Sequence, residues 1–280
     1  MTTPQHLHIV GYGWHESGIY LKARAWPVSA NTPSEKLPLD GTLRIKRHSE
    51  RLCAGWYDFE SDVHAPCPDR ALPRKTQCEG CIDREGFTPW LRCDGRMLPP
   101  LKPAVRAYIQ SPHRLYLACF GDDVVKVGMA SVQRGHDRLW DQGPLAAYYI
   151  AASDGISIRQ LEVEASELGF TETMRRSRKR DLLTSGMRRE DAYRRLNSAV
   201  DRLRAQLPPD SLSLMHDPVE LPMPNLTRKA RDFRELEKLI PDDRIIEGDV
   251  IAASGSTVIL NDGGVHATLD VYDLISHQVE

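Results

Sequence analysis

The stretch His113-Arg-Leu-Tyr-Leu-Ala-Cys-Phe-Gly-Asp-Asp-Val-Val-Lys-Val-Gly128 decides the fold of the middle of this 280-residue chain. Two β-prone runs flank a Gly-Asp-Asp turn, a pattern typical of a β-hairpin. A polar, arginine-rich helix is predicted over 131–141, and a third strand over 145–151. Residues 157–169 place apolar side chains at helical spacing and end on a glycine, which predicts a second helix. The centre is therefore expected to be a small three-stranded sheet with flanking helices.

The flanking segments have different patterns. Short strand-like runs separated by polar loops fill residues 1–60, and strand-like runs with Gly-rich turns return at the C-terminal end. Between them, a long helix is predicted over 188–207, where Pro208-Pro209 ends it. The expected fold class is α+β, in four parts: a β-rich region with a cysteine cluster at 1–100, an α/β domain at 101–183, a basic helical segment and linker at 184–240, and a small β-module at 241–280.

The overall composition excludes few classes of protein. Hydrophobic residues make up 41% of the chain, charged residues 27%, and the net charge is only −2. No apolar run is long enough to span a membrane, and the N-terminus lacks the features of a secretory signal. These features favour a cytoplasmic protein in a reducing compartment, where clustered cysteines are more often metal ligands than disulfides.

Cysteines gather in a short polar segment that buries little apolar surface. Cys78 and Cys81 form a Cys-x-x-Cys pair, which directs two sulfurs at one tetrahedral ion. With Cys53 and Cys67 ahead of them, they predict a structural Zn²⁺ site. Separate buried thiols and a redox pair are the alternatives. Further candidate ligands are Cys93 and His64, so which cysteine is spare stays open.

The central motifs resemble those of a GIY-YIG nuclease domain. The similarity rests on Tyr116-Leu-Ala, Lys126-Val-Gly128, two arginines on the next helix and two glutamates on a later one. Residues 5–275 also resemble an uncharacterised bacterial domain-of-unknown-function family. In that family a cysteine cluster precedes a Lys-Val-Gly segment and an Arg-Leu-x-x-Gln-Gly motif, here Arg138-Leu-Trp-Asp-Gln-Gly143.

The nuclease resemblance implies metal-dependent phosphodiester cleavage. Tyr116 would orient or deprotonate the attacking water. Arg134 or Arg138 would clamp the phosphate. A single Mg²⁺ or Mn²⁺ would be held by Glu162, with Glu164 as the second choice. Lys126 stands where the nuclease family has its second tyrosine, and it offers a positive donor to phosphate. By base rate each of these residues, taken alone, is a packing or surface residue.

A basic stretch follows the predicted active-site segment. Residues 174–204 contain eleven Lys and Arg against four Asp and Glu. The first five, predicted to bind nucleic acid through its phosphates, are Arg175, Arg176, Arg178, Lys179 and Arg180. The alternative is a helix whose arginines are solvated on its outer face.

Three functions are compatible with these patterns. The first is a GIY-YIG-like phosphodiesterase acting on nucleic acid. The second is a nucleic-acid-binding protein that does not cleave, and the third is a different enzyme on the same scaffold with a small anionic substrate. The choice between DNA and RNA stays open, as does the oligomeric state.

Overall fold

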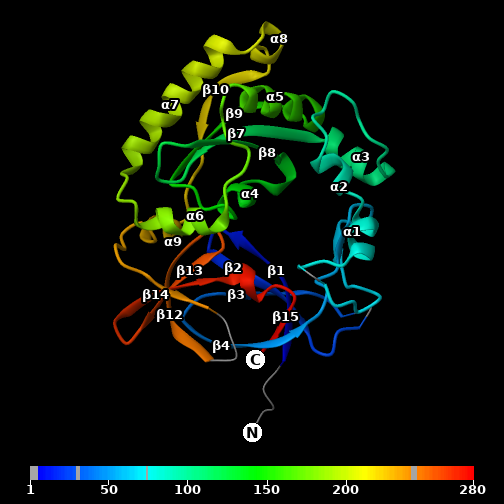
Figure 1. Cartoon of the computed structure of the whole chain (residues 1–280), viewed down its shortest axis with the longest axis vertical. Coiled ribbons are helices and arrows are strands. Elements are labelled where there is room, and N and C mark those ends of the chain that lie inside the picture. The colour runs from blue at the N-terminus through cyan, green and yellow to red at the C-terminus, as the bar shows by residue number, and fades with distance from the viewer. Residues whose placement is uncertain (1–5, 30–31, 74, 241–244) are drawn as a thin grey trace. The chain divides into compact units, whose positions relative to one another are not determined.

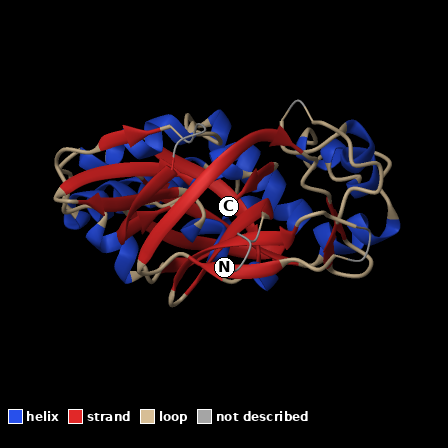
Figure 2. Cartoon of the chain, turned by 90° about the horizontal axis from the view of Figure 1, so that it is seen from below, coloured by secondary structure: helices blue, strands red, loops and turns tan. Residues whose placement is uncertain are grey.

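The structure is a computed structural model that describes residues 6–29, 32–73, 75–240 and 245–280. It mixes helices with long strands, as Figure 1 and Figure 2 show, so the expected α+β class is confirmed. Residue contacts divide the chain into two compact units. The first combines Met1–Thr88 with Glu235–Glu280, and the second is Pro89–Arg234. No helix in the described ranges is long and apolar enough to cross a membrane.

The first unit is built on a nine-stranded sheet within the described residues, in the order β11-β14-β13-β12-β4-β15-β1-β2-β3. A two-stranded ribbon, β5-β6, and a short helix, α1, lie between β4 and the second unit along the chain. The elements are β1 (Leu7–His15), β2 (Gly18–Ala25), β3 (Glu35–Pro38), β4 (Thr42–Arg51), β5 (Trp56–Asp58), β6 (Val63–Ala65), α1 (Glu79–Glu85), β11 (Glu237–Leu239), β12 (Ile245–Ser254), β13 (Thr257–Asp262), β14 (Val265–Asp270), the 3-10 turn η3 (Val271–Leu274) and β15 (His277–Val279).

Strands from both ends of the chain share this sheet. Ile246 of β12 is opposite Ile45 of β4, and both side chains are buried. β15 pairs with both β1 and β4. Trp14 adds a link between the two ends, because its Nε1 donates to the carbonyl of Gly255 at 2.9 Å. The sequence predicts two separate parts at 1–100 and 241–280, whereas in the structure their strands form one sheet.

The second unit contains a four-stranded antiparallel sheet in the order β10-β9-β7-β8. The predicted hairpin is β7-β8, and the predicted third strand is β9. β10 is an additional edge strand from the segment predicted as helix and linker at 184–240. The elements are α2 (Thr88–Leu91), α3 (Pro103–Gln110), β7 (Pro112–Cys119), β8 (Val125–Ser131), η1 (Val132–Arg134), α4 (Asp137–Trp140), β9 (Ala146–Asp154), α5 (Gly155–Glu167), α6 (Arg176–Asp181), η2 (Leu182–Thr184), α7 (Arg189–Gln206), α8 (Pro209–Leu212), β10 (Met215–Glu220) and α9 (Asn225–Lys229).

The helix predicted over 131–141 is broken in the structure. A 3-10 turn, η1, is followed by Gly135 with φ of +52° and then by the short helix α4. A positive φ cannot continue a right-handed helix, and glycine adopts it at little cost. The arginines of this segment therefore lie on two short elements instead of one helix face.

One face of the four-stranded sheet carries the core of the second unit. Leu115, Leu117 and Val127 pack there with the apolar sides of α5 and α7. Because strand side chains alternate between faces, Tyr116 of β7 and Lys126 of β8 lie on the opposite face. This arrangement separates the core residues of the hairpin from the residues predicted to act on phosphate.

Candidate functional site

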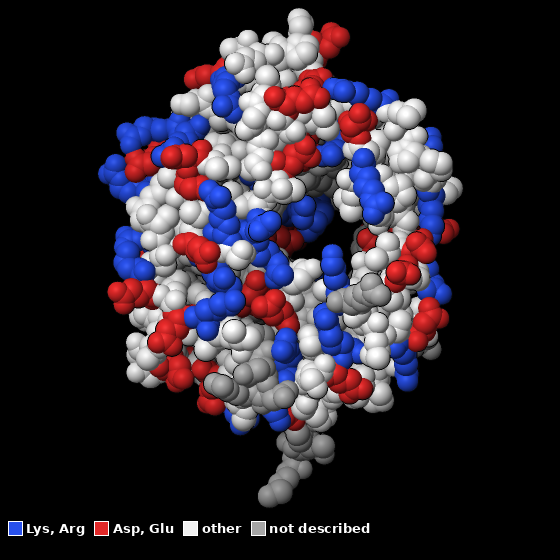
Figure 3. Space-filling view, in the orientation of Figure 1, with Lys and Arg blue, Asp and Glu red and all other residues white. Residues whose placement is uncertain are grey.

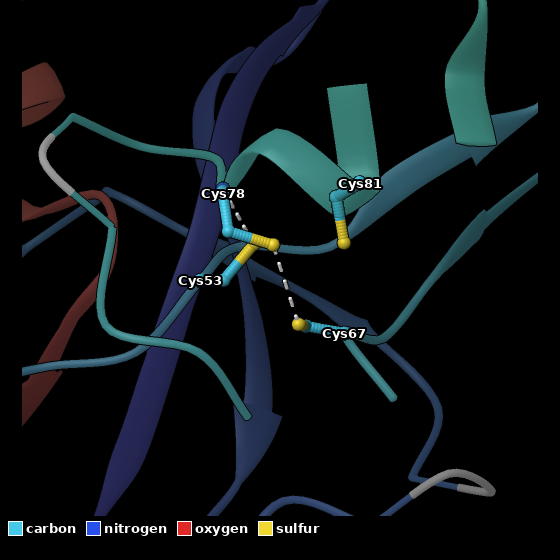
Figure 4. Close-up of side chains that lie close together, drawn as sticks. All are labelled: Cys53, Cys67, Cys78 and Cys81. Carbon is cyan, nitrogen blue, oxygen red and sulfur yellow. Dashed lines mark hydrogen bonds between the residues drawn. The ribbon is translucent and has the colours of Figure 1, made fainter. Parts of the chain in front are cut away.

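Four cysteines come together in the first unit. Cys53 follows β4 and Cys67 follows β6, while Cys78 precedes α1 and Cys81 lies in its first turn. Their four sulfurs lie within 4.8 Å of one another, and Figure 4 shows them directed at a common centre. The Sγ atoms of Cys67 and Cys78 are 3.8 Å apart. The Cys-x-x-Cys pair thus supplies two sulfurs from one turn, as its spacing predicts.

The donor set of this cluster suits a divalent ion such as zinc. Burial raises the pKa of Cys53 to about 11, although backbone N–H groups of Cys78 and Gly55 oppose the shift. Burial and the nearby Cys53 also raise the pKa of Cys81. Buried thiolates side by side repel one another, and a bound cation removes that repulsion by sharing their charge. Four sulfur donors in tetrahedral reach are typical of structural zinc.

A glycine fixes the chain beside this cluster. Gly55 has φ of +96°, and a Cβ there would overlap the carbonyl oxygen of Ala65. The close approach lets β5 and β6 pair directly after Cys53 and bring Cys67 back to it. The Sγ of Cys53 also accepts the N–H groups of Gly55 at 3.4 Å and Cys78 at 3.2 Å.

The other two candidate ligands have partners of their own. Cys93 belongs to the second unit, where its Sγ accepts the N–H of Gly95 and contacts the carbonyl of Met97, each at 3.2 Å. His64 Nδ1 is 3.1 Å from a guanidinium nitrogen of the buried Arg24. Burial, followed by the charge of Arg24, lowers the pKa of His64 to about 4.

A hydrogen-bonded chain of polar side chains lies on the non-core face of the second unit's sheet. Gln142 donates from Nε2 to the hydroxyl of Tyr116 at 2.6 Å. Lys179 donates from Nζ to Oε1 of the same glutamine at 3.2 Å. Gln142 follows α4, and Lys179 lies on α6, so three elements contribute to one network. All of it is buried or half-buried.

Lys126 borders this network from the neighbouring strand. Its Nζ lies 5.4 Å from the centre of the Tyr116 ring and donates to the carbonyl of Glu172 at 2.7 Å. Gly128 is opposite Tyr116 in the β7-β8 ladder. A Cβ on Gly128 would overlap the Tyr116 hydroxyl and would lie 3.0 Å from Nζ of Lys126. The glycine of the Lys-Val-Gly motif therefore leaves the space that the tyrosine hydroxyl occupies.

The ionisation of Lys179 is strongly perturbed. Burial, then the charges of Lys126 and Arg138, lower the pKa of Lys179 to about 7, while Asp141 opposes the shift. Its Nζ also lies 4.9 Å above the ring of Phe120. An amine with a pKa near neutrality can act as a proton donor or acceptor at physiological pH.

The two arginines predicted to clamp phosphate have different surroundings. Arg134 forms an ion pair with Asp141 at 2.8 Å. Arg138 is exposed on α4; its carbonyl accepts a 3.4 Å hydrogen bond from Gln142, and its charge helps to lower the pKa of Lys179. Arg138 is therefore the arginine associated with the tyrosine network, and Arg134 is engaged by a neighbouring carboxylate.

Glu162 belongs to a different cluster. Its carboxylate is buried on α5 and accepts from Arg159 at 2.5 Å. The same guanidinium reaches Glu172 at 2.9 Å and the carbonyl of Cys93 at 2.9 Å. Burial raises the pKa of Glu162, although Arg159 and Lys126 oppose the shift. Lys126 borders both the tyrosine network and this cluster, because its Nζ donates to the carbonyl of Glu172. The guanidinium of Arg159 already lies between the carboxylates of Glu162 and Glu172. Glu164, the second choice, bonds to Ser211 instead at 2.5 Å.

The basic stretch has less free charge than its sequence indicates. Arg178 binds Asp122 at 2.6 Å, and Arg180 lies 3.6 Å from the neighbouring Asp181. Lys179 points into the tyrosine network, whereas Arg175 and Arg176 are exposed. A cavity of about 950 Å³ along α7 is lined by three arginines: Arg194 and Arg195 are paired in the same way, with Asp191 and Asp123, and Arg202 lies 4.0 Å from the centre of the Phe170 ring. Figure 3 shows basic and acidic side chains interspersed on the displayed face.

Sequence reasoning missed two members of the network. Gln142 belongs to the Arg-Leu-Trp-Asp-Gln-Gly motif, which is the sequence signal that points to it, but the motif alone does not indicate a contact with Tyr116. The sequence predicts a nucleic-acid-binding surface for Lys179, because it lies in a run of arginines. Its direction depends on α6 lying beside Gln142 and Phe120, which no local pattern indicates.

Comparisons with known proteins add no identity. No protein-family model, curated protein or solved structure matches this chain.

Proposed function

We propose that the second unit is a GIY-YIG-like domain and that the protein is a phosphodiesterase acting on nucleic acid. One observation carries the proposal: Tyr116, Gln142 and Lys179 form a buried hydrogen-bonded chain beside Lys126 and Arg138. These residues come from β7, β8, α4 with the turn after it, and α6. A tyrosine hydroxyl among cationic groups suits a substrate with a negatively charged reacting centre.

The topology agrees with the proposed class. The strand with the tyrosine motif, β7, lies between the Lys-Val-Gly strand β8 and the third strand β9. An exposed arginine follows on α4 and an acidic residue on the later helix α5. This is the order in which the proposed nuclease class presents its tyrosine, its arginine and its metal-binding glutamate.

Each residue of the network has a distinct role in the proposal. Tyr116 orients the attacking water or takes its proton. Gln142 fixes the direction of the tyrosine hydroxyl and couples it to Lys179, whose amine can exchange a proton near pH 7. Arg138 and Lys126 offset the charge of the phosphoryl oxygens. The structural zinc of the first unit has no part in this chemistry.

The proposed catalytic Mg²⁺ or Mn²⁺ has Glu162 as its ligand. This carboxylate is held by Arg159, so a divalent ion must displace the guanidinium or share the acid with it. The second candidate function follows from the same contact. If Arg159 permanently takes the place of the metal, the domain binds nucleic acid through its phosphates without cleaving it.

The first experiment is a cleavage assay on labelled DNA and RNA with Mg²⁺ or Mn²⁺, using Tyr116→Phe and Tyr148→Phe. Tyr148 lies on β9 and packs in the core of the other sheet face, so it is a matched control. We expect Tyr116→Phe to lower the cleavage rate by about 100-fold or more, because the lost group takes part in proton transfer. Tyr148→Phe is expected to keep the wild-type rate. Equal rates for Tyr116→Phe and the wild type contradict the proposed role.

The second experiment separates the two candidate functions through Glu162→Gln. Loss of cleavage with unchanged affinity for nucleic acid supports the metal-dependent phosphodiesterase. Binding without cleavage in the wild type, at every divalent ion tested, supports the non-catalytic protein. Absence of both binding and cleavage at low salt rejects nucleic acid as the substrate and leaves the small anionic substrate.

A further inference from the structure

A second cationic cavity lies in the same unit and contains none of the residues of the tyrosine network. It has a volume of about 310 Å³, the lower end of the range for small-molecule sites. Pro144, Leu145, Met187 and Met223 supply apolar walls. Five arginines and a single acid, Asp232, supply the charges; the arginines are Arg188, Arg189, Arg228, Arg231 and Arg234.

Three buried polar atoms of this lining have no hydrogen-bond partner among the described residues. They are Oγ1 of Thr227 and the Nε atoms of Arg189 and Arg231. Thr227 is only 2% exposed. A buried hydroxyl or N–H without a partner costs free energy, so such groups in a native structure usually meet a ligand, an ion or a water. Their occurrence around one cavity points to a ligand that accepts hydrogen bonds.

The charges of the lining are largely uncompensated. Arg188 alone among the five has a carboxylate partner in the described part of the chain, Asp191 at 3.2 Å. Arg228 contacts the neutral amide of Asn225. Arg231 donates to the carbonyls of Phe120 and Leu182 at 2.9 Å each, as well as to that of Gly143. Burial lowers the pKa of Arg231 to about 10, so it remains protonated at neutral pH.

We propose that this cavity binds a terminal phosphate group, either on a free nucleotide or at the end of a nucleic-acid strand. A terminal phosphate carries about two negative charges near neutral pH and offers three acceptor oxygens, whereas an internal phosphodiester carries one. Guanidinium groups bind such oxygens bidentately, and the Thr227 hydroxyl can donate to the same group. The apolar walls suit the sugar or base attached to it.

The proposal deepens the proposed phosphodiesterase function, since it identifies which end or product such an enzyme holds. The two are linked by Arg231, which donates to the carbonyl of Gly143 next to Gln142. The residues that line the cavity are nevertheless different from those of the tyrosine network. A protein that cleaves nothing can still bind a phosphate there, and the experiment below does not depend on cleavage.

The experiment measures binding of pyrophosphate to the full chain by calorimetry at low salt. The test variants are Thr227→Val, which keeps the side-chain shape, and the double variant Arg228→Gln/Arg234→Gln, which alters two exposed arginines. The control is Arg92→Gln/Arg106→Gln, two exposed arginines of the same unit outside the cavity. We expect affinity to fall about 10-fold or more in the double variant and about 5-fold in Thr227→Val, as for lost hydrogen bonds to a charged ligand. The control is expected to remain within about twofold of the wild type.

Competition then identifies the source of the phosphate. If a 5′-phosphorylated oligonucleotide displaces pyrophosphate and its 5′-hydroxyl counterpart does not, the cavity binds the phosphate at the end of a strand. Displacement by a nucleoside monophosphate alone assigns a free nucleotide. The proposal is overturned if the wild type does not bind pyrophosphate, or if the cavity variants and the control lose affinity equally. Tyr116→Phe is expected to bind pyrophosphate with wild-type affinity. The binding measurement therefore tests the cavity alone, and the cleavage assay tests the phosphodiesterase proposal.

Discussion

At the scale of single residues, the candidate active site depends on one small side chain. Gly128 leaves room for the hydroxyl of Tyr116, which a Cβ at that position would overlap. The hydroxyl can then reach Gln142, and through it Lys179. A strand glycine usually weakens a sheet, so its presence in β8 indicates a close approach that a larger residue prevents.

Gly128→Ala tests this close approach. The added methyl group must displace the Tyr116 hydroxyl, which breaks its 2.6 Å bond to Gln142. We expect a cleavage rate close to that of Tyr116→Phe, with a loss of about 100-fold, and little change in the far-ultraviolet circular dichroism spectrum. Gly135→Ala is the control. Gly135, at the end of η1, has a positive φ and open space around its Cβ position, so this variant strains the backbone without overlapping another side chain. A fully active Gly128→Ala variant would show that the tyrosine hydroxyl is dispensable or relocates freely.

Lys179 gives a prediction about pH. Its pKa is lowered to about 7 by burial and then by Lys126, so Lys126→Met is expected to raise it by removing a like charge. Nitrogen-detected NMR of the lysine amine measures the shift directly, with Arg106→Gln as a control at an exposed position. Deprotonation removes a positive charge, so affinity for phosphate is expected to fall as pH rises from about 6 to about 8. An unchanged Lys179 pKa in Lys126→Met would contradict the proximity of the two amines.

Residue patterns predicted part of this site and not the rest. Tyr116, Lys126 and Arg138 followed from short motifs that keep their order along the hairpin and the next helix. Glu162 was predicted to face a metal, but Arg159 lies three residues away on the same helix and binds its carboxylate. The Arg159 and Glu162 pair is visible in the sequence. Whether the buried carboxylate binds an arginine or a metal ion depends on the surrounding fold.

At the scale of elements, local periodicity was a good guide to helices. α7 begins and ends within one residue of the predicted 188–207, and α5 within two residues of 157–169. Both helices have apolar stripes and end at Pro or Gly. The helix predicted over 131–141 was wrong because Gly135 takes a positive φ. β10 was not predicted, since its sequence Met-His-Asp-Pro-Val-Glu has little strand pattern and it pairs only at the sheet edge.

The packing of α7 on the sheet can be tested with one pair of variants. Leu196 is fully buried in the core that α5 and α7 share with β7 and β9, whereas its neighbour Asn197 is exposed. We expect Leu196→Ala to lower the free energy of unfolding by about 3 kcal/mol. Asn197→Ala is expected to change it by less than about 0.5 kcal/mol. Urea denaturation measures the free energy of unfolding of both variants, and amide hydrogen exchange in β7 gives a second measurement. Equally small effects of the two substitutions would mean that Leu196 does not pack α7 against the sheet.

At the scale of the whole molecule, the arrangement of segments was the least predictable feature. Four successive parts were expected, but the structure has two units, and the first is assembled from both ends of the chain. The pairing of Ile45 with Ile246 is a tertiary property of the β4-β12 ladder. Each strand is recognisable locally, but its partner is not, because any alternating strand offers the same backbone groups to many others.

The cysteine segment is the part of the molecule that we expect to depend most on metal. Among the described residues, its hydrophobic cluster consists of Cys53, Cys67 and Cys81, with Trp56, Ala71 and Cys78 packed against them. Such a small core offsets little of the entropy of ordering the segment, so we expect metal binding to supply much of the difference. A strong chelator is therefore expected to speed amide hydrogen exchange first around β5, β6 and α1, while β7 and β9 stay protected.

Two variants make this last prediction specific. Cys81→Ser removes one of the four sulfurs and is expected to abolish a zinc content of about one ion per chain, with fast exchange around α1 even without chelator. Cys93→Ser is the matched control, because a serine hydroxyl can keep the contacts that Cys93 makes with Gly95 and Met97. It is expected to retain both the zinc and the protection. Unchanged exchange around α1 in chelator, or zinc retained by Cys81→Ser, would show that this segment is held by contacts other than a metal bound to the four cysteines.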